Sequence, residues 1–104
     1  MTTGDMMRTV LIEALNVDED LAEKAVRESV IALSTIVELN NESLQVEPHD
    51  DVRGVQASFI LNESDNSQSF GQAVASALKA LINIRLHMTN KATIKVTVRT
   101  EKGE

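Results

Sequence analysis

The chain has 104 residues, a formal net charge of −6 and no cysteine. This length fits one domain with one hydrophobic core, and the lack of cysteine excludes disulfides and thiolate zinc sites. No stretch approaches the roughly 20 apolar residues of a membrane span, and the first residues do not resemble a secretory signal. We therefore expect a single cytoplasmic domain over residues 1–104, with 1–4 and 101–104 frayed.

The first part of the chain predicts two helices. Apolar residues over 5–15 recur at helical spacing, Asp5 is a suitable N-cap, and Asn16 is expected to end this helix. Asp18 is then a good cap for a second helix. Its apolar arc extends the prediction to Leu39, with acidic residues in the first turns where the helix dipole favours them.

The rest of the chain predicts three strands and a third helix. Residues 44–48 and 55–61 alternate between apolar and polar, and the link between them favours an antiparallel hairpin. A helix is expected from Ser69 to about His87, because its apolar residues cover most of the circumference. Residues 94–98 alternate again and predict a final strand with one wet face.

These elements predict an α+β domain with the order α-α-β-β-α-β. We expect a two-layer α/β sandwich in which the helices cover one face of a three-stranded mixed sheet. The third helix would cross over so that the last strand runs parallel to the second. With the three predicted strands numbered in chain order, two orders in the sheet stay open. One is 1-2-3, which we favour, and the other is 2-1-3, in which the last strand adds beside the first.

Charge divides the sequence into two unlike halves. Residues 1–52 contain twelve acidic and three basic side chains, a net charge of −9, whereas residues 53–104 contain four acidic and seven basic ones, a net charge of +3. Separated charges on a small domain favour oriented docking onto a charged partner or onto a second copy of the chain. The overall negative charge argues against binding to nucleic acid.

Residues that carry chemistry are few. Glu47, His49, Asp50 and Asp51 form an oxygen-rich loop that could hold a cation, but their spacing matches no EF-hand or zinc pattern, so we expect a solvated turn and no metal. Glycine-rich phosphate loops and G-x-S-x-G are absent from the sequence. We therefore expect a protein that is not an enzyme and has no cofactor.

Three further residues are candidates for an interface. Arg85 falls inside the apolar arc of the third helix, so it extends to solvent from the last turn, pairs with a carboxylate such as Glu38, or contacts a partner. Ile31 and Ile60 are apolar residues at positions expected to face water. They would mark a contact surface if they belonged to one patch.

Lys95 and Arg99 lie on the polar face of the final strand. Basic residues commonly protect an edge strand against unwanted pairing, and the alternative interpretation is a strip that binds phosphate.

The leading functional prediction is a protein–protein interaction module. A small inhibitor, an immunity-type protein or an adaptor would dock its acidic helical half on a basic partner through Asp20, Glu23, Glu28 and Ile31. Ile60, Arg85, Lys95 and Arg99 are the additional interface candidates. One alternative is a self-assembling homo-oligomer, and another is a weak nucleic-acid binder that uses the basic strand face.

Overall fold

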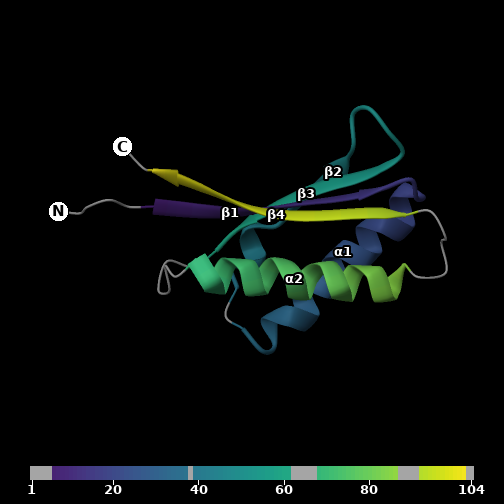
Figure 1. Cartoon of the computed structure of the whole chain (residues 1–104). Helices are drawn as coiled ribbons and strands as arrows, with labels where there is room; N and C mark the ends of the chain where they lie inside the picture. The colour runs from purple at the N-terminus through teal and green to yellow at the C-terminus, as the bar shows by residue number, and fades with distance from the viewer. Residues whose placement is uncertain (1–5, 38, 62–67, 87–91, 103–104) are drawn as a thin grey trace.

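A computed structural model describes residues 6–37, 39–61, 68–86 and 92–102. The elements in these residues are β1 (Met6–Leu15), α1 (Glu19–Ser34), the short 3-10 helix η1 (Asn41–Ser43), β2 (Gln45–Pro48), β3 (Gly54–Ile60), α2 (Gln68–Arg85) and β4 (Thr93–Lys102). The strands form one sheet, and both helices lie on the same side of it (Figure 1). The predicted α+β class is confirmed.

Strand β1 corrects the predicted first helix. Val10, Ile12 and Ala14 are buried beneath the helices, whereas Leu11 and Leu15 alternate with them and are half-buried on the opposite face. Apolar residues on both faces concealed the two-residue alternation and imitated helical spacing. β1 pairs with a strand on each side. This tertiary pairing decides the conformation, and local propensity does not encode it.

The sheet has the strand order β2-β3-β1-β4, and every neighbouring pair is antiparallel. The predicted three-stranded mixed sheet is therefore wrong, because β1 supplies a fourth strand at its centre. The last strand does not lie beside β3, since β1 separates them. β3 and β4 both run antiparallel to β1 and are joined through α2, while β1 and β2 are joined through α1. Two interleaved βαβ units of this kind make a ferredoxin-like arrangement.

Helix α1 begins at the predicted place but ends earlier than predicted. The Asp18 carboxylate accepts hydrogen bonds from two backbone N–H groups of the first turn, at 3.1 and 3.3 Å. At the other end, the hydroxyls of Ser34 and Thr35 donate to backbone carbonyls of the preceding turn, both at 2.7 Å. Such local bonds compete with helix continuation. The helix stops at Ser34 rather than Leu39, and Leu39 is buried after the turn.

The remaining elements follow the prediction with changes at their ends. The β2–β3 hairpin is antiparallel as predicted. α2 begins at Gln68 and ends at Arg85, and His87 lies outside the described residues. β4 extends to Lys102, and all ten of its residues pair with β1. Residues 1–4 and 103–104 also lie outside the described part.

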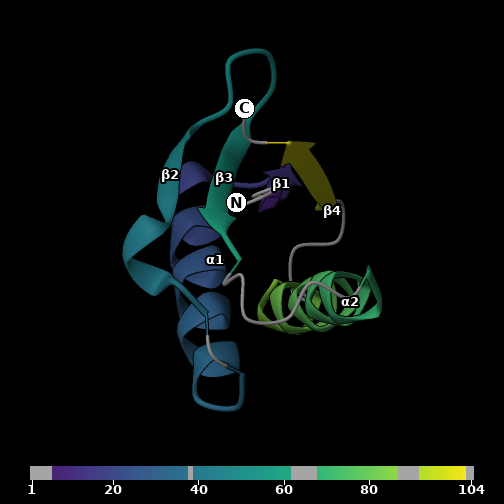
Figure 2. The same ribbon diagram turned by 90° about the vertical axis from the view of Figure 1, so that its left-hand side faces the viewer.

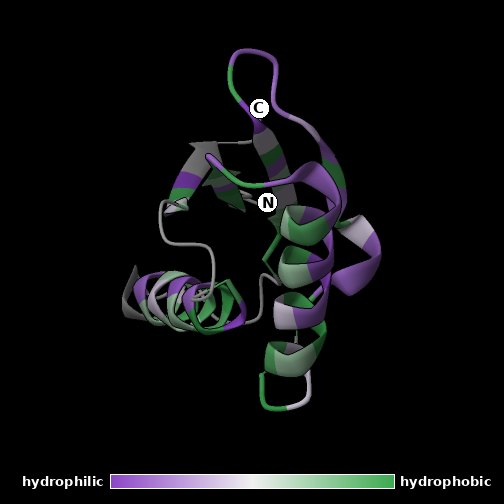
Figure 3. Cartoon of the chain, turned by 90° about the vertical axis from the view of Figure 1, so that its right-hand side faces the viewer, coloured by the Kyte–Doolittle hydropathy of each residue, from purple (hydrophilic) through white to green (hydrophobic). Residues whose placement is uncertain are grey.

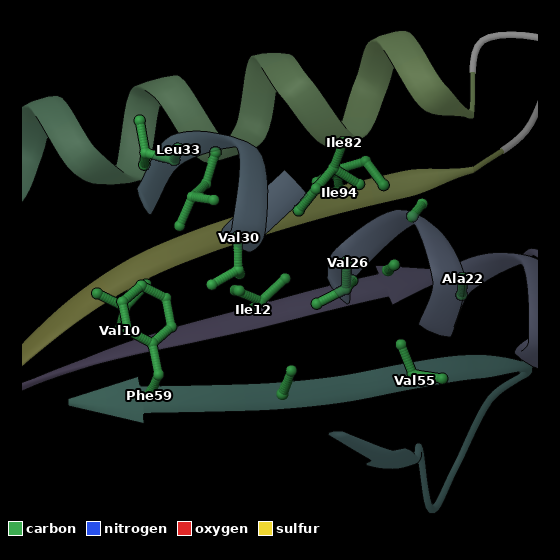
Figure 4. Close-up of a cluster of buried hydrophobic side chains, with 14 of the residues drawn as sticks. Val10, Ile12, Ala22, Val26, Val30, Leu33, Val55, Phe59, Ile82 and Ile94 are labelled. Carbon is green, nitrogen blue, oxygen red and sulfur yellow. The ribbon is translucent and has the colours of Figure 1, made fainter. Parts of the chain in front are cut away.

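The hydrophobic core fills the space between the sheet and the two helices (Figure 4). Phe59 of β3 is its largest fully buried side chain, and Ile12 of β1 lies beside it in the same layer. From the helices, Val26 and Val30 of α1 and Ile82 of α2 point into the core and are also fully buried. Burial of these side chains fixes both helices on one face and leaves the other face of the sheet open.

Candidate functional site

The open face of the sheet contains a shallow groove of about 420 Å³. Residues that alternate with the buried ones along each strand line this groove. They include Leu11 and Glu13 of β1, Glu47 of β2, Gln56 and Ser58 of β3, and Lys95 of β4. The groove therefore offers polar side chains of both charges around a small apolar centre.

One row of side chains crosses all four strands in this groove. The strand register pairs Lys95 with Glu13, Glu13 with Gln56, and Gln56 with Glu47. Neighbouring strands lie about 4.8 Å apart, so the two carboxylate residues are separated by about 10 Å across the sheet. Ser58 also lines the groove, and within the described residues its hydroxyl has no hydrogen bond to a histidine or carboxylate that would activate it.

His49 connects the β2–β3 loop to the central strand. Its Nδ1 accepts hydrogen bonds from the backbone N–H groups of Asp51 and Val52, at 3.1 and 3.4 Å. A nitrogen that accepts carries no proton, so the proton of the neutral ring is on Nε2. Nε2 lies 3.1 Å from Glu13 Oε2 and donates to it. The His49 side chain is 14% exposed. One ring nitrogen therefore orders the loop itself, and the other holds the loop against β1.

We expect His49→Ala to loosen this loop. The change removes three hydrogen bonds, of which each contributes about 0.5–1.5 kcal/mol, so the free energy of unfolding should fall by about 1.5–4.5 kcal/mol. Urea denaturation measures this loss, and amide hydrogen exchange should accelerate at Asp51 and Val52. Asp50→Ala is the matched control in the same loop. Equal stability and exchange in both variants would contradict the role given to His49.

In the part of the chain that the structure describes, which includes the oxygen-rich loop, no three His, Asp or Glu side chains are placed so that they could hold a metal ion. His49 is turned toward Glu13 and the backbone, whereas Asp50 and Asp51 are exposed. The carboxylates of these two aspartates are therefore in contact with solvent.

Exposed carboxylates gather along the side of the molecule formed by α1, η1, β2 and the β2–β3 loop. We call this surface the acidic edge, and it consists of Asp18, Glu19, Asp20, Glu42, Glu47, Asp50 and Asp51. The loop and the segment around η1 are largely hydrophilic (Figure 3). The start of α1 abuts the loop, because the Asp18 carboxylate lies 3.9 Å from Arg53 Nη2. Several chain segments thus contribute to one acidic surface.

Basic residues lie at the opposite edge. Strands β2 and β4 are at the two ends of the sheet, with α1 beneath the β2 side and α2 beneath the β4 side (Figure 2). Residues 68–86 and 92–100 contain no Asp or Glu. Lys79 of α2 and Lys95 and Arg99 of β4 are exposed there. We call these three residues the basic edge. The charge separation of the sequence therefore persists in the folded chain, although β1, which comes from the acidic half of the sequence, lies at the centre of the sheet.

Two of the predicted site residues are bound to each other. Arg85 Nε lies 3.6 Å from Glu28 Oε1, and this ion pair joins α2 to α1 with half-exposed side chains. The carboxylate partner named from the sequence, Glu38, lies outside the described residues. Glu23 pairs with Arg27 at 2.9 Å within α1. Of the three acidic residues predicted to contact a partner, only Asp20 belongs to the acidic edge as defined above.

The two isoleucines do not share a patch. Ile31 is 57% exposed on α1, in the helical layer. Ile60 is half-buried and follows the buried Phe59 on β3, so it lies on the open face of the sheet. Its backbone N–H donates to the Ser43 hydroxyl at 2.8 Å.

The sequence interpretation missed the role of Glu13, because residues 5–15 were assigned to a helix. The alternation of buried Val10 and Ile12 with Leu11 and Glu13 was the available signal. It also missed the contact between His49 and Glu13, which are 36 positions apart. Only the correct sheet topology brings them together.

Fold and surfaces together define a small α+β domain with two oppositely charged edges and one open sheet face. No protein-family model and no curated protein matches this chain. Neither helix in the described part of the chain has both the length and the apolar character needed to cross a membrane.

Proposed function

We propose that this protein is a non-enzymatic interaction module that docks its acidic edge on a basic surface of another protein. Small inhibitors, immunity-type proteins and adaptors work in this way. The observation that carries the proposal is the clustering of exposed carboxylates from α1, η1, β2 and the β2–β3 loop on one side, away from the basic edge. A one-sided charge orients a partner before contact and accelerates association.

The partner chemistry follows from the composition of this edge. The carboxylates of the acidic edge supply hydrogen-bond acceptors for Lys and Arg. Leu21 of α1 and Val52 of the β2–β3 loop are 48% and 43% exposed, so the same side of the molecule also offers apolar side chains. A basic partner surface with an apolar centre would complement both features. Charges at a protein surface are screened over about 10 Å at 0.1 M salt. Association with this partner should therefore weaken steeply as salt rises.

The test compares two variants with the same change in net charge. The first, Asp20→Asn/Glu42→Gln/Glu47→Gln, neutralises the acidic edge. The second, Gln72→Lys/Ser76→Lys/Asn83→Lys, adds the same charge on the exposed side of α2. Each immobilised protein is used for capture from an extract of the source cell, and each captured protein is then titrated in purified form. We expect a partner that binds wild type and the α2 variant but loses about tenfold or more in affinity for the first variant.

Two results would contradict the proposal. One is a partner that binds both variants equally, and the other is a complex whose affinity does not change between about 50 and 500 mM salt.

A second candidate function is self-assembly, and the opposite charges of the β2 and β4 edges favour it. Copies arranged head to tail would bring the acidic edge of one against the basic edge of the next and form rings or filaments. Light scattering at high protein concentration tests this candidate. A strict monomer would remove it.

A further inference from the structure

We propose that the free edge of β4 binds an extended acidic segment of a partner protein by strand addition. This site is at the opposite side of the molecule from the acidic edge and does not depend on the function proposed for that edge. An added strand would extend the sheet order to β2-β3-β1-β4-partner.

The backbone of β4 is suited to further pairing. In sheet order it is an end strand, and within the described residues only β1 pairs with it. Its pairing with β1 is continuous from Thr93 to Lys102 without a bulge. The strand contains neither proline nor glycine. Short length, bulges, proline and charged side chains are the usual devices that prevent an edge from pairing. Of these, β4 has only charged side chains, whereas β2, at the other end of the sheet, has four residues and ends in Pro48.

The side chains of β4 indicate which segment would fit. Lys95 and Arg99 are exposed on the open face and lie about 14 Å apart along the strand. No ion pair engages Lys95 in the described part of the chain. On the other face, Val96 and Val98 pack only partly against the core, next to α2. A strand added beside β4 would have two faces. Side chains on one face would contact these two valines, and side chains on the other face would lie beside Lys95 and Arg99. The fitting segment therefore alternates apolar and acidic residues.

Charge complementarity favours this occupant over a second copy of β4 paired about Thr97. Antiparallel pairing of two β4 strands centred on Thr97 would set Lys95 of each copy against Arg99 of the other. Like charges directly opposite each other are destabilising. A partner with Glu or Asp at these positions replaces the repulsion with attraction, so the same residues that disfavour one partner select another.

The experiment uses peptides of about nine residues with blocked ends. The first alternates Val with Glu, the second replaces each Glu by Lys, and the third is the first peptide with N-methyl groups on alternate residues. Each is titrated into ¹⁵N-labelled protein at low salt. We expect the first peptide to shift the resonances of backbone amides along β4 and to protect these amides from exchange. Both other peptides should bind more weakly by about tenfold or more.

Matched variants separate local from overall charge. Lys95→Glu/Arg99→Glu should reverse the preference, so that the Lys peptide binds more tightly than the Glu peptide. Lys24→Glu/Arg53→Glu makes the same change in net charge at the opposite edge and should keep the wild-type preference.

Three outcomes would overturn the proposal. They are amide shifts confined to other elements, equal binding of the N-methylated peptide, and a homodimer in light scattering that protects the β4 amides without any peptide. The last outcome would identify a second copy as the occupant of the edge.

Discussion

Gly54→Ala should unfold much of the protein, with a loss of more than about 3 kcal/mol in the free energy of unfolding. Gly54 has φ of +131°, a conformation that residues with a side chain rarely adopt. A Cβ at this position would overlap the backbone carbonyl of Ala14 on β1 and lie 2.9 Å from the Cα of Leu15. Backbone atoms of a central strand cannot move aside, so strain and steric overlap act together.

Gly71→Ala is the matched control for this prediction. Gly71 lies within α2, and a Cβ there would meet its nearest neighbour, Val98 Cγ1, at 3.4 Å, which is ordinary contact. Alanine favours a helix interior over glycine by about 1 kcal/mol, so this variant should be as stable as wild type or more stable. Urea denaturation followed by circular dichroism measures both variants. A Gly54→Ala protein with the wild-type midpoint would show that Gly54 does not adopt this positive φ.

Phe59→Ala should cost about 3–5 kcal/mol, because it removes a large side chain and leaves a cavity that rigid neighbours cannot fill. Phe59 is 1% exposed and points from β3 into the layer between sheet and helices (Figure 4). With a loss of this size, the variant should also bind a dye for exposed apolar surface.

Ile60→Ala tests the opposite face at the next position of the same strand. Ile60 is half-buried on the open face, so its truncation should cost less than about 1.5 kcal/mol. Chemical denaturation at low and high protein concentration compares the two variants. An equal loss for both would mean that the open face is covered in solution, and dependence on protein concentration would attribute the cover to self-association.

The sequence predicted those elements whose signals are local. Asp18 is a capping residue followed by helical periodicity, and the strands around Val46, Phe59 and Val96 alternate clearly enough to be recognised. β1 could not be recognised in this way, because a central strand with apolar residues on both faces has no polar side to reveal its period. Once β1 was assigned to a helix, the number and order of strands could not be correct.

The candidate surfaces were predictable only in part. The charge division of the sequence persists because β2 and β4, which come from different halves, lie at opposite ends of the sheet. Nothing local in the sequence requires that order. The pairing of Arg85 with Glu28 and of His49 with Glu13 depends on how helices and strands meet. The spacing of side chains in the sequence therefore identified Arg85 and His49 as residues of interest but did not identify the carboxylates that they contact.

The central position of β1 also has a consequence for biosynthesis. β1 emerges first from the ribosome, yet its two neighbours, β3 and β4, are made later, and β4 is the last element of the described chain. Until then an extended segment with apolar side chains on both faces has no completed sheet to join. Such nascent segments are targets for chaperones and prone to aggregation. Folding of this domain therefore requires nearly all of its residues, from β1 to β4.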